Sequence, residues 1–383
     1  MQSAVRLRWL LVRVTIVALT LVTTGEMGCG GGLIGDGSNN SNARQIIYVG
    51  NLQANTVSAY QIKSNGSLVA VSGSPFPLGG FTLVGDPHRK ALFSLQTGAN
   101  AIQLNTNSVN ADGSLKMSSS ISDDTLAGVQ AINPAGTVLY VSSINAAEDN
   151  RGWKIYSIQA NGSLQFVDGL IDQEAGRPVF TPDGSAAFAA SCTHLIPNIE
   201  QFAVAENGML TNARNQIATP VAFGQCPNAV TLSPDGNVLA APWSDGSDGN
   251  SLDAAQNFIT LFNIDPGTHE LSPPAGSIFP ASGAGRDITF DPSGKFVVTA
   301  QDNGIGIYEV GMNSLTEVKG SPFGGVAVDR LMFSPSGAFV AAVSGAAGQI
   351  LVFSFDSSTG AVTLAPGSPV ATPNPFDLAI MPQ

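Results

Sequence analysis

The sequence predicts an all-β fold, a seven-bladed β-propeller of four-stranded antiparallel blades. Three observations support this prediction: a proline at the end of an apolar alternation recurs seven times, a second turn also recurs seven times, and the two ends of the chain carry complementary halves of one repeat. A sequence period of about 40 to 50 residues is typical of propeller blades. The composition agrees, because 43 glycines and 23 prolines supply turns while 43% hydrophobic residues supply a core.

Residues 1–28 have the pattern of a secretory signal peptide. A basic start with Arg6, Arg8 and Arg13 leads into the apolar run Val14–Val22. This run is too short to cross a bilayer comfortably as a helix, and small residues follow it, as at a signal-peptide cleavage site. We therefore expect an extracytoplasmic protein.

Cys29 stands in a context that resembles a bacterial lipoprotein cleavage site, where the cysteine is acylated and becomes the new N-terminus. Gly28 precedes it, but Glu26 stands where that pattern has an apolar residue. We expect a lipid at Cys29 and a membrane-tethered protein in the periplasm or at the cell surface; the alternative is simple secretion. Residues 29–45, rich in Gly, Ser and Asn, are predicted to form a flexible tether because they cannot bury enough apolar area to offset their ordering entropy.

In six of the repeats a proline stands between two apolar alternations, usually with a glycine two residues later, and the seventh proline ends the last strand. The seven prolines are Pro87, Pro134, Pro182, Pro234, Pro292, Pro335 and Pro382. Their spacings of 47, 48, 52, 58, 43 and 47 residues give a mean repeat of roughly 49. Each hairpin is predicted to join the innermost strand of a blade to its second strand.

A second turn lies before the first proline and again between each pair of consecutive prolines. The turn residues are Asn65-Gly66, Asp112-Gly113, Asn161-Gly162, Asn207-Gly208, Pro266-Gly267, Asn313-Ser314 and Thr359-Gly360. Asn-Gly and Asp-Gly between apolar alternations are strong hairpin signals because both residues tolerate a positive φ. Gly-Ser-Pro segments such as Gly73–Phe76 follow these hairpins and are predicted to connect one blade to the next.

The two ends of residues 46–383 are predicted to share one blade. Residues 46–62 have no proline strand before them, whereas the last repeat stops just after Pro382. The C-terminal strand would supply the innermost strand of the first blade, and this closure removes free sheet edges. An open β-solenoid is the alternative, but it would not need complementary halves at its ends.

With these repeats, residues 46–383 resemble the seven-bladed lactonase propellers, which include 6-phosphogluconolactonase-like proteins with YVTN-type repeats. The resemblance rests on Tyr48–Asn51, on the repeated Pro-Asp-Gly and Pro-Ser-Gly hairpins, and on residues 283–303, GAGRDITFDPSGKFVVTAQDN. It implies hydrolysis of a sugar lactone or another acidic lactone by arginines, a histidine and a carboxylate. Arg286 takes the family's arginine position, and Gln301 lies near the family's glutamine.

Other positions depart from that pattern. Arg177 stands where the family has a histidine. The family's glutamate position falls at about Cys192, and a second expected histidine falls near Val129. The resemblance therefore implies a lactonase-like propeller with a degenerate active site. Of the three histidines, only His194 follows a second strand on the face where inner strands begin, and it is the candidate replacement base.

Arg286 and Arg177 begin inner strands, so both are predicted at one mouth of the central channel. A guanidinium matches carboxylate and phosphate bidentately, and these arginines are candidates to hold an anionic ligand and stabilise an oxyanion. Asp287 and Gln301 are further candidate ligand contacts. The alternative is that Arg286 pairs with Asp287 and only completes the channel wall.

Cys192 and Cys226 remain once Cys29 is assigned to the tether. Cys192 follows a second strand and Cys226 precedes the next inner strand, so the two should be close. In an oxidising compartment they are predicted to form a disulfide, with a nucleophilic thiol as the alternative.

The charge balance excludes nucleic acid as a partner, because the net charge is −12 and such binding depends on Lys and Arg. We expect no cofactor and no metal, a monomer, and a membrane link only through a lipid. Two functions stay open: a binding propeller for a small anionic or carbohydrate-derived ligand or a protein partner, and a lactone hydrolase. Fold does not decide between them.

Overall fold

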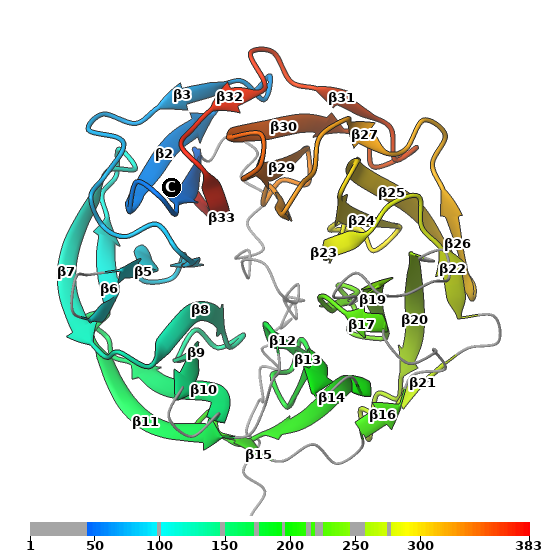
Figure 1. The fold of residues 1–383 in the computed structure, drawn as a ribbon, viewed down its shortest axis with the longest axis horizontal. Coiled ribbons are helices and arrows are strands. Elements are labelled where there is room, and N and C mark those ends of the chain that lie inside the picture. Colours follow the sequence, from blue (N-terminus) through cyan, green and yellow to red (C-terminus); the bar gives the residue numbers. More distant parts are fainter. Residues whose placement is uncertain are drawn as a thin grey trace, which may run out of the picture.

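The computed structural model describes residues 44–97, 101–145, 150–171, 176–193, 196–211, 216–218, 225–245, 257–273 and 277–383. Every regular element in these ranges is a β-strand, and the strands form seven antiparallel sheets arranged as blades around a central axis (Figure 1). The predicted all-β, seven-bladed propeller is confirmed. No helix in these ranges is long and apolar enough to cross a membrane.

The blades follow one another along the chain. Blade one holds β1 (Gln45–Asn51), β2 (Thr56–Ile62), β3 (Leu68–Ala70) and β33 (Pro375–Pro382); blade two holds β4 (Leu83–Asp86), β5 (Ala91–Thr97), β6 (Ile102–Val109) and β7 (Leu115–Ser122); blade three holds β8 (Leu126–Ile132), β9 (Val138–Asn145), β10 (Asn150–Ile158) and β11 (Leu164–Ile171); blade four holds β12 (Val179–Phe180), β13 (Ala186–Thr193), β14 (Ile196–Val204), β15 (Leu210–Thr211) and β16 (Gln216–Ala218).

The remaining blades contain short additional strands. Blade five holds β17 (Gln225–Pro227), β18 (Thr231–Leu232), β19 (Val238–Asp245), β20 (Phe258–Ile264), β21 (Leu271–Ser272) and β22 (Ile278–Pro280); blade six holds β23 (Gly285–Phe290), β24 (Phe296–Gln301), β25 (Gly304–Gly311), β26 (Ser314–Glu317) and β27 (Phe323–Gly324); blade seven holds β28 (Arg330–Phe333), β29 (Phe339–Ser344), β30 (Gln349–Phe355), β31 (Val362–Leu364) and β32 (Val370–Ala371). In each of these blades the path of four strands runs from the axis outwards, as predicted.

The ring closes through blade one, as predicted. Strand β33 pairs antiparallel with β1 over its whole length, from Gln45 opposite Pro382 to Asn51 opposite Pro375. The last strand of the chain is thus the innermost strand of the first blade and lies next to the central axis (Figure 1).

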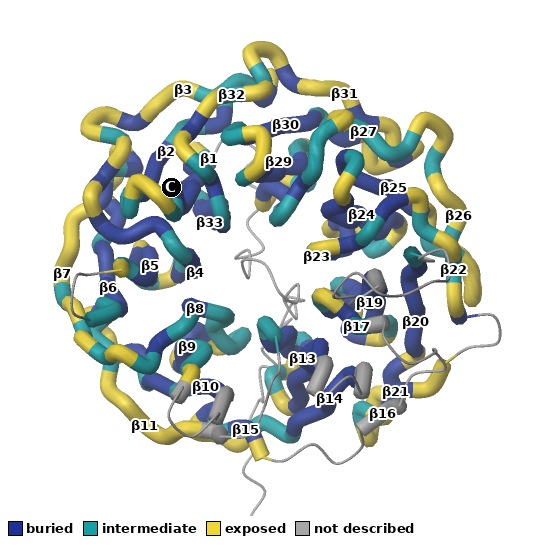
Figure 2. Tube along the Cα trace, viewed as in Figure 1, coloured by how far each residue is buried: buried dark blue, intermediate teal, exposed yellow. Residues whose placement is uncertain are grey.

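The core lies between neighbouring blades. One cluster joins Val298 and Ile307 of blade six to Val340 and Phe353 of blade seven, and six similar clusters occupy other parts of the ring. Figure 2 shows the burial concentrated in the middle strands of each blade, with exposed residues on the outer strands. Face-to-face packing of adjacent sheets therefore holds the propeller together.

The Gly-Ser-Pro segments have a further role beside the predicted connection. Phe76 exchanges backbone hydrogen bonds with Val57 of β2, and the hydroxyl of Ser74 accepts a hydrogen bond from the amide of Ala59 at 2.9 Å. Ser321 and Ser368 accept equivalent bonds in blades six and seven. Where the outer strand of a blade ends, these segments continue the pairing along the same edge of the sheet. Only a short part of that sheet edge therefore stays free.

The proline hairpins form a contact ring on the face opposite the start of the inner strands. The glycine after Pro234 packs on the proline of the preceding blade, and similar contacts recur at Gly184, Gly294 and Gly337. A Cβ atom at Gly236 would lie 2.5 Å from Cδ of Pro182. Each Pro-x-Gly hairpin is therefore both a turn and an interface between blades.

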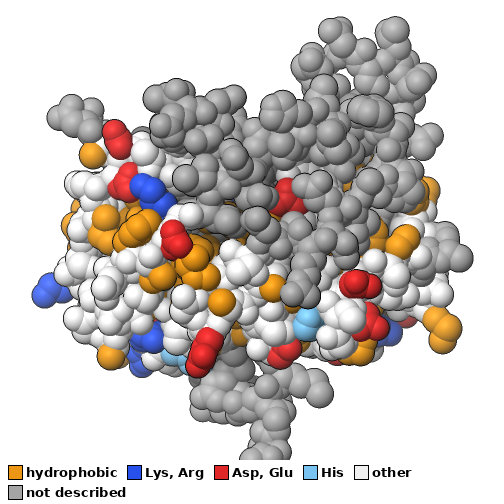
Figure 3. Space-filling view, turned by 90° about the horizontal axis from the view of Figure 1, so that it is seen from below, with side chains coloured by type: hydrophobic (Ala, Val, Ile, Leu, Met, Phe, Trp, Pro, Cys, Tyr) orange, Lys and Arg blue, Asp and Glu red, His pale blue; other side chains and the backbone are white. Residues whose placement is uncertain are grey.

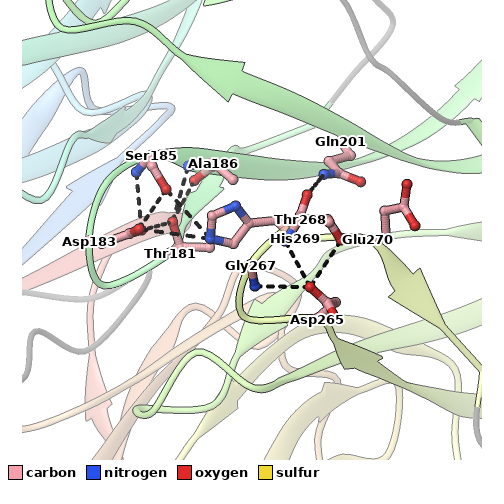
Figure 4. Close-up of polar contacts among 10 residues, drawn as sticks. All are labelled: Thr181, Asp183, Ser185, Ala186, Gln201, Asp265, Gly267, Thr268, His269 and Glu270. Atoms are coloured by element: carbon pink, nitrogen blue, oxygen red, sulfur yellow. Dashed lines mark hydrogen bonds and ion pairs between the residues drawn. The ribbon is translucent and has the colours of Figure 1, made fainter.

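The outer hairpin of blade five also contacts blade four (Figure 4). His269 has a positive φ of 57°, and its Nε2 lies 3.8 Å from Oδ2 of Asp183 and 3.5 Å from Oγ of Ser185. His269 thus belongs to the contact between blades four and five, at the hairpin that joins β12 to β13, and not to the end where the inner strands begin. Charged side chains are sparse on the described part of the rim, as the edge-on view shows (Figure 3).

We predict that Gly236→Ala lowers the free energy of unfolding by about 2 to 4 kcal/mol, because alanine is strained at a φ of 72° and its methyl group would overlap Pro182. The matched control is Gly325→Ala. Gly325 has a φ of 65° but nothing within 4 Å of a Cβ, so only the backbone cost of about 1 to 2 kcal/mol is expected. Urea denaturation measures both, and equal losses would contradict the interface role.

Candidate functional site

The inner strands of the propeller begin in a regular way. The amides of Phe81, Gly176, Asn228 and Asp329 donate to the carbonyls of Leu95, Ala190, Pro242 and Val343, each fourteen residues later in the chain. Each donor lies six residues before the proline of its blade. This shared geometry places the same two positions of successive repeats at one end of the central axis.

We call this end the mouth and define it by the residues six and five positions before each proline. In chain order these are Phe81 and Thr82, Gly176 and Arg177, Asn228 and Ala229, Arg286 and Asp287, Asp329 and Arg330, and Phe376 and Asp377. In blade three, irregularities in the pairing of β8 shift this count. The mouth therefore contains three arginines and three aspartates outside blade three.

Arg177 pairs with Asp377 across the mouth. Nη2 of Arg177 lies 3.0 Å from Oδ2 of Asp377, and the carboxylate is only 2% exposed. Arg177 directly precedes β12 of blade four whereas Asp377 belongs to β33 of blade one, and Figure 1 shows these strands on opposite sides of the axis. The arginine side chain thus spans the central channel.

The other two arginines pair with neighbouring blades. Arg286 of blade six donates from Nη1 to Oδ1 of Asp329, whose other oxygen accepts the amide of Gly345 at 2.7 Å. Nη1 of Arg330 lies 3.5 Å from Oδ1 of Asp287. The predicted alternative partner of Arg286 was Asp287, but the structure gives it Asp329. The formal charges of these six side chains cancel.

The field at the mouth keeps Arg330 charged. Burial of the guanidinium acts against its charge, but the carboxylates of Asp287, Asp377 and Asp329 together raise its pKa above the ordinary value of arginine. Arg330 therefore lies within electrostatic reach of all three aspartates, and the pairs behave as one network rather than as separate contacts.

Side chains five positions before the proline also link consecutive inner strands. Oδ2 of Asp377 accepts the amide of Leu83 at 3.0 Å, and Oδ2 of Asp287 accepts the amide of Leu331 at 3.2 Å. The hydroxyl of Thr82 accepts the amide of Val129 in the same way. These three bonds attach the inner strands of blades one, two and six to the next blade.

Aromatic side chains occupy another sector of the mouth. Phe81 and Phe376 stack with ring centroids 5.0 Å apart and an angle of 27° between their planes. Both side chains are partly exposed. The mouth therefore combines an apolar surface with a ring of paired charges, the composition typical of ligand sites.

Gln301 lies inside blade six rather than at the mouth. Gln301 is fully buried. Its Nε2 donates hydrogen bonds to Thr299 and to the hydroxyl of Tyr308 at 2.8 and 2.9 Å, and its Oε1 accepts one from Ser282. A ligand contact through this amide, as predicted from its position near the family glutamine, would require these bonds to break.

The cysteine and histidine predictions fall partly outside the described residues. Cys226 on β17 is disulfide-bonded, and β17 lies against β13, the strand that contains Cys192. The side chain of Cys192 lies outside what the structure describes, so the Cys192–Cys226 pairing stays a prediction. The described ranges also leave out the signal peptide, Cys29 and His194. Of the predicted tether they include only Arg44 and Gln45, and Gln45 already belongs to β1.

Sequence reasoning found Arg177, Arg286 and Asp287 but missed three residues of the mouth. Asp329, Arg330 and Asp377 occupy the same positions relative to their prolines, so a comparison of all seven repeats could have found them. What the repeats do not show is which charge pairs with which. Among the described residues, no group of three or more His, Cys, Asp and Glu is placed to hold a metal ion.

Solved structures share this fold. The chain is similar to a candidate 6-phosphogluconolactonase of Bacteroides uniformis (17% identity, TM-score 0.70), to a protein from Lactobacillus plantarum (14%, 0.71) and to the periplasmic gluconolactonase of Pseudomonas aeruginosa (19%, 0.69). Each match covers 88% of this chain and 99% of the other. No protein-family model matches the sequence, and no curated protein does either.

These likenesses confirm the fold that the resemblance implied. At 14 to 19% identity they show the architecture alone, because unrelated functions share propellers. Any evidence of function therefore lies in the residues of the mouth.

Blade four buries a carboxyl group away from the mouth. Glu200 on β14 is 3% exposed and lies opposite Ala189, on the face that packs against blade three. Burial raises the pKa of Glu200, and a hydrogen bond with Ser191 offsets this only in part. Because the pKa is higher in the folded state than in the unfolded state, the free energy of unfolding is greatest at low pH. It falls as the pH rises from the ordinary pKa of glutamate through the raised pKa.

We predict that Glu200→Gln removes this pH dependence. At pH 4 the two proteins should unfold with similar free energies, and towards pH 7 the wild type should become progressively less stable than the variant. Urea denaturation at several pH values measures the difference. A difference that does not change with pH would show that Glu200 does not ionise at a raised pKa.

Proposed function

We propose that this protein is an extracytoplasmic binding propeller whose mouth holds an uncharged, hydroxyl-rich ligand derived from a carbohydrate. The observation that carries the proposal is the pairing of the mouth's arginines with aspartates: Arg177 with Asp377, Arg286 with Asp329, and Arg330 with Asp287. An anionic ligand would have to displace an aspartate from each guanidinium, whereas hydroxyl groups can donate to the carboxylates and accept from the arginines without disrupting the pairs.

The most accessible pair has suitable exposure for such contacts. The side chain of Arg286 is 46% exposed and that of Asp329 is 27% exposed. The stacked Phe81 and Phe376 supply an apolar surface at the same end of the axis, which suits the carbon face of a sugar ring. The predicted signal peptide and Cys29 support a location outside the cytoplasm, and the likeness to a periplasmic gluconolactonase is consistent with it.

A lactone hydrolase is the second candidate, and one observation favours it. An enzyme of this kind needs a carboxylate or histidine within hydrogen-bond reach of its oxyanion-binding arginine, and Asp329 meets that requirement at Arg286. Against it, both oxygens of Asp329 already accept hydrogen bonds, from Arg286 and from the amide of Gly345. A base at this position would have to give up one of these hydrogen bonds before it could take a proton from water.

We predict that titration calorimetry detects binding of neutral mono- or oligosaccharides to the purified chain lacking residues 1–28. Arg286→Ala should weaken that binding about tenfold or more, because a charge-assisted hydrogen bond is lost. Arg89→Ala is the matched control: it also breaks an ion pair, with Asp86, but at the opposite face of the ring, and should leave the affinity unchanged.

The same proteins distinguish the binding function from the second candidate, a lactone hydrolase. Under the binding proposal, hydrolysis of aldonolactones stays at the rate of the buffer. Turnover above that rate, lost in Arg286→Ala and in Asp329→Asn but kept in Arg89→Ala, would overturn the proposal in favour of a hydrolase.

A further inference from the structure

The carboxylate of Asp377 lies in a position built for an anion. Nη2 of Arg177 donates to Oδ2 at 3.0 Å, the amide of Leu83 donates to the same oxygen at 3.0 Å, and the amide of Leu378 donates to Oδ1 at 2.9 Å. The positive charge of Arg330 acts on the same carboxylate. Donors from blades one, two and four therefore converge on one pair of oxygens.

Asp377 cannot leave this position by a change of side-chain rotamer alone. It is almost fully buried, and its backbone lies in β33, opposite Gly50 of β1, in the pairing that closes the ring. Removing the carboxylate from the mouth would require the closing strand to separate from blade one. The group is thus a permanent occupant and not a gate.

We infer that Asp377 is the specificity-determining residue of the mouth: it occupies, from within the chain, the place that a ligand carboxylate or phosphate would take, and so excludes anionic ligands. This inference rests on the proposed binding function. It explains why a mouth with three arginines accepts an uncharged ligand, since the strongest anion position is already filled.

The inference predicts that deletion of the carboxylate creates an anion site. In Asp377→Ala, Arg177 and the amide of Leu83 lose their acceptor, and the mouth gains one net positive charge. Formate has the size of the deleted group and serves as the probe. The variant should melt at a lower temperature than the wild type in chloride, and formate should raise its midpoint by about 2 to 4 °C at ten times the dissociation constant.

Two controls separate site binding from general salt effects. The wild type should respond equally to sodium formate and to sodium chloride at the same concentration. Asp377→Asn neutralises the charge but fills the space, so it should show no formate-specific stabilisation. Adding Arg177→Met to Asp377→Ala should abolish most of the effect, because the main charged donor is then missing.

A folded Asp377→Ala that responds alike to formate and chloride would overturn the inference. If the variant does not fold in chloride, the yield of folded protein on refolding in formate replaces the melting temperature, and no gain in yield would also overturn it. The readout involves no sugar. If formate does not stabilise the variant, the proposed sugar-binding function still stands. If the wild type binds no sugar, the formate experiment on the variant can still be interpreted.

Discussion

The pairing of β33 with β1 is the constraint on which both the ring and its mouth depend. It joins the two ends of the described chain in one blade and removes the edges that an open array would expose. It also brings Asp377 to the axis, where this carboxylate meets Arg177 from the opposite side and the amide of Leu83 from the next blade. The strand pairing that closes the ring therefore also places the carboxylate that neutralises Arg177.

A second consequence concerns charge. In a chain with a net charge of −12, arginines on one surface would suggest an attraction for anions. In the mouth, however, each guanidinium already faces a carboxylate, and the pairs are partly withdrawn from solvent. Partly buried pairs of this kind fix geometry more than they add stability. The mouth thus combines three internally paired arginines with the stacked Phe81 and Phe376.

Most of the fold could be predicted from the sequence because its determinants are local and repeated. The proline hairpins, the Asn-Gly turns and the complementary ends each depend on a few neighbouring residues, and all were placed correctly. The pairing of Arg286 with Asp329 could not be predicted, because it depends on how far one blade is rotated relative to the next. Likewise, Gln301 matched a family position in sequence, yet its side chain turns into the blade, where Thr299 and Tyr308 bind it.

Arg177 and Asp377 interact directly across the channel, and a double-mutant cycle measures the strength of this interaction. Arg177→Met, Asp377→Asn and the double variant would be compared with the wild type by urea denaturation. We expect a coupling free energy of about 1 to 3 kcal/mol between the two positions, so that the double variant loses less stability than the sum of the single ones. Additive losses would mean that the two side chains do not interact across the channel.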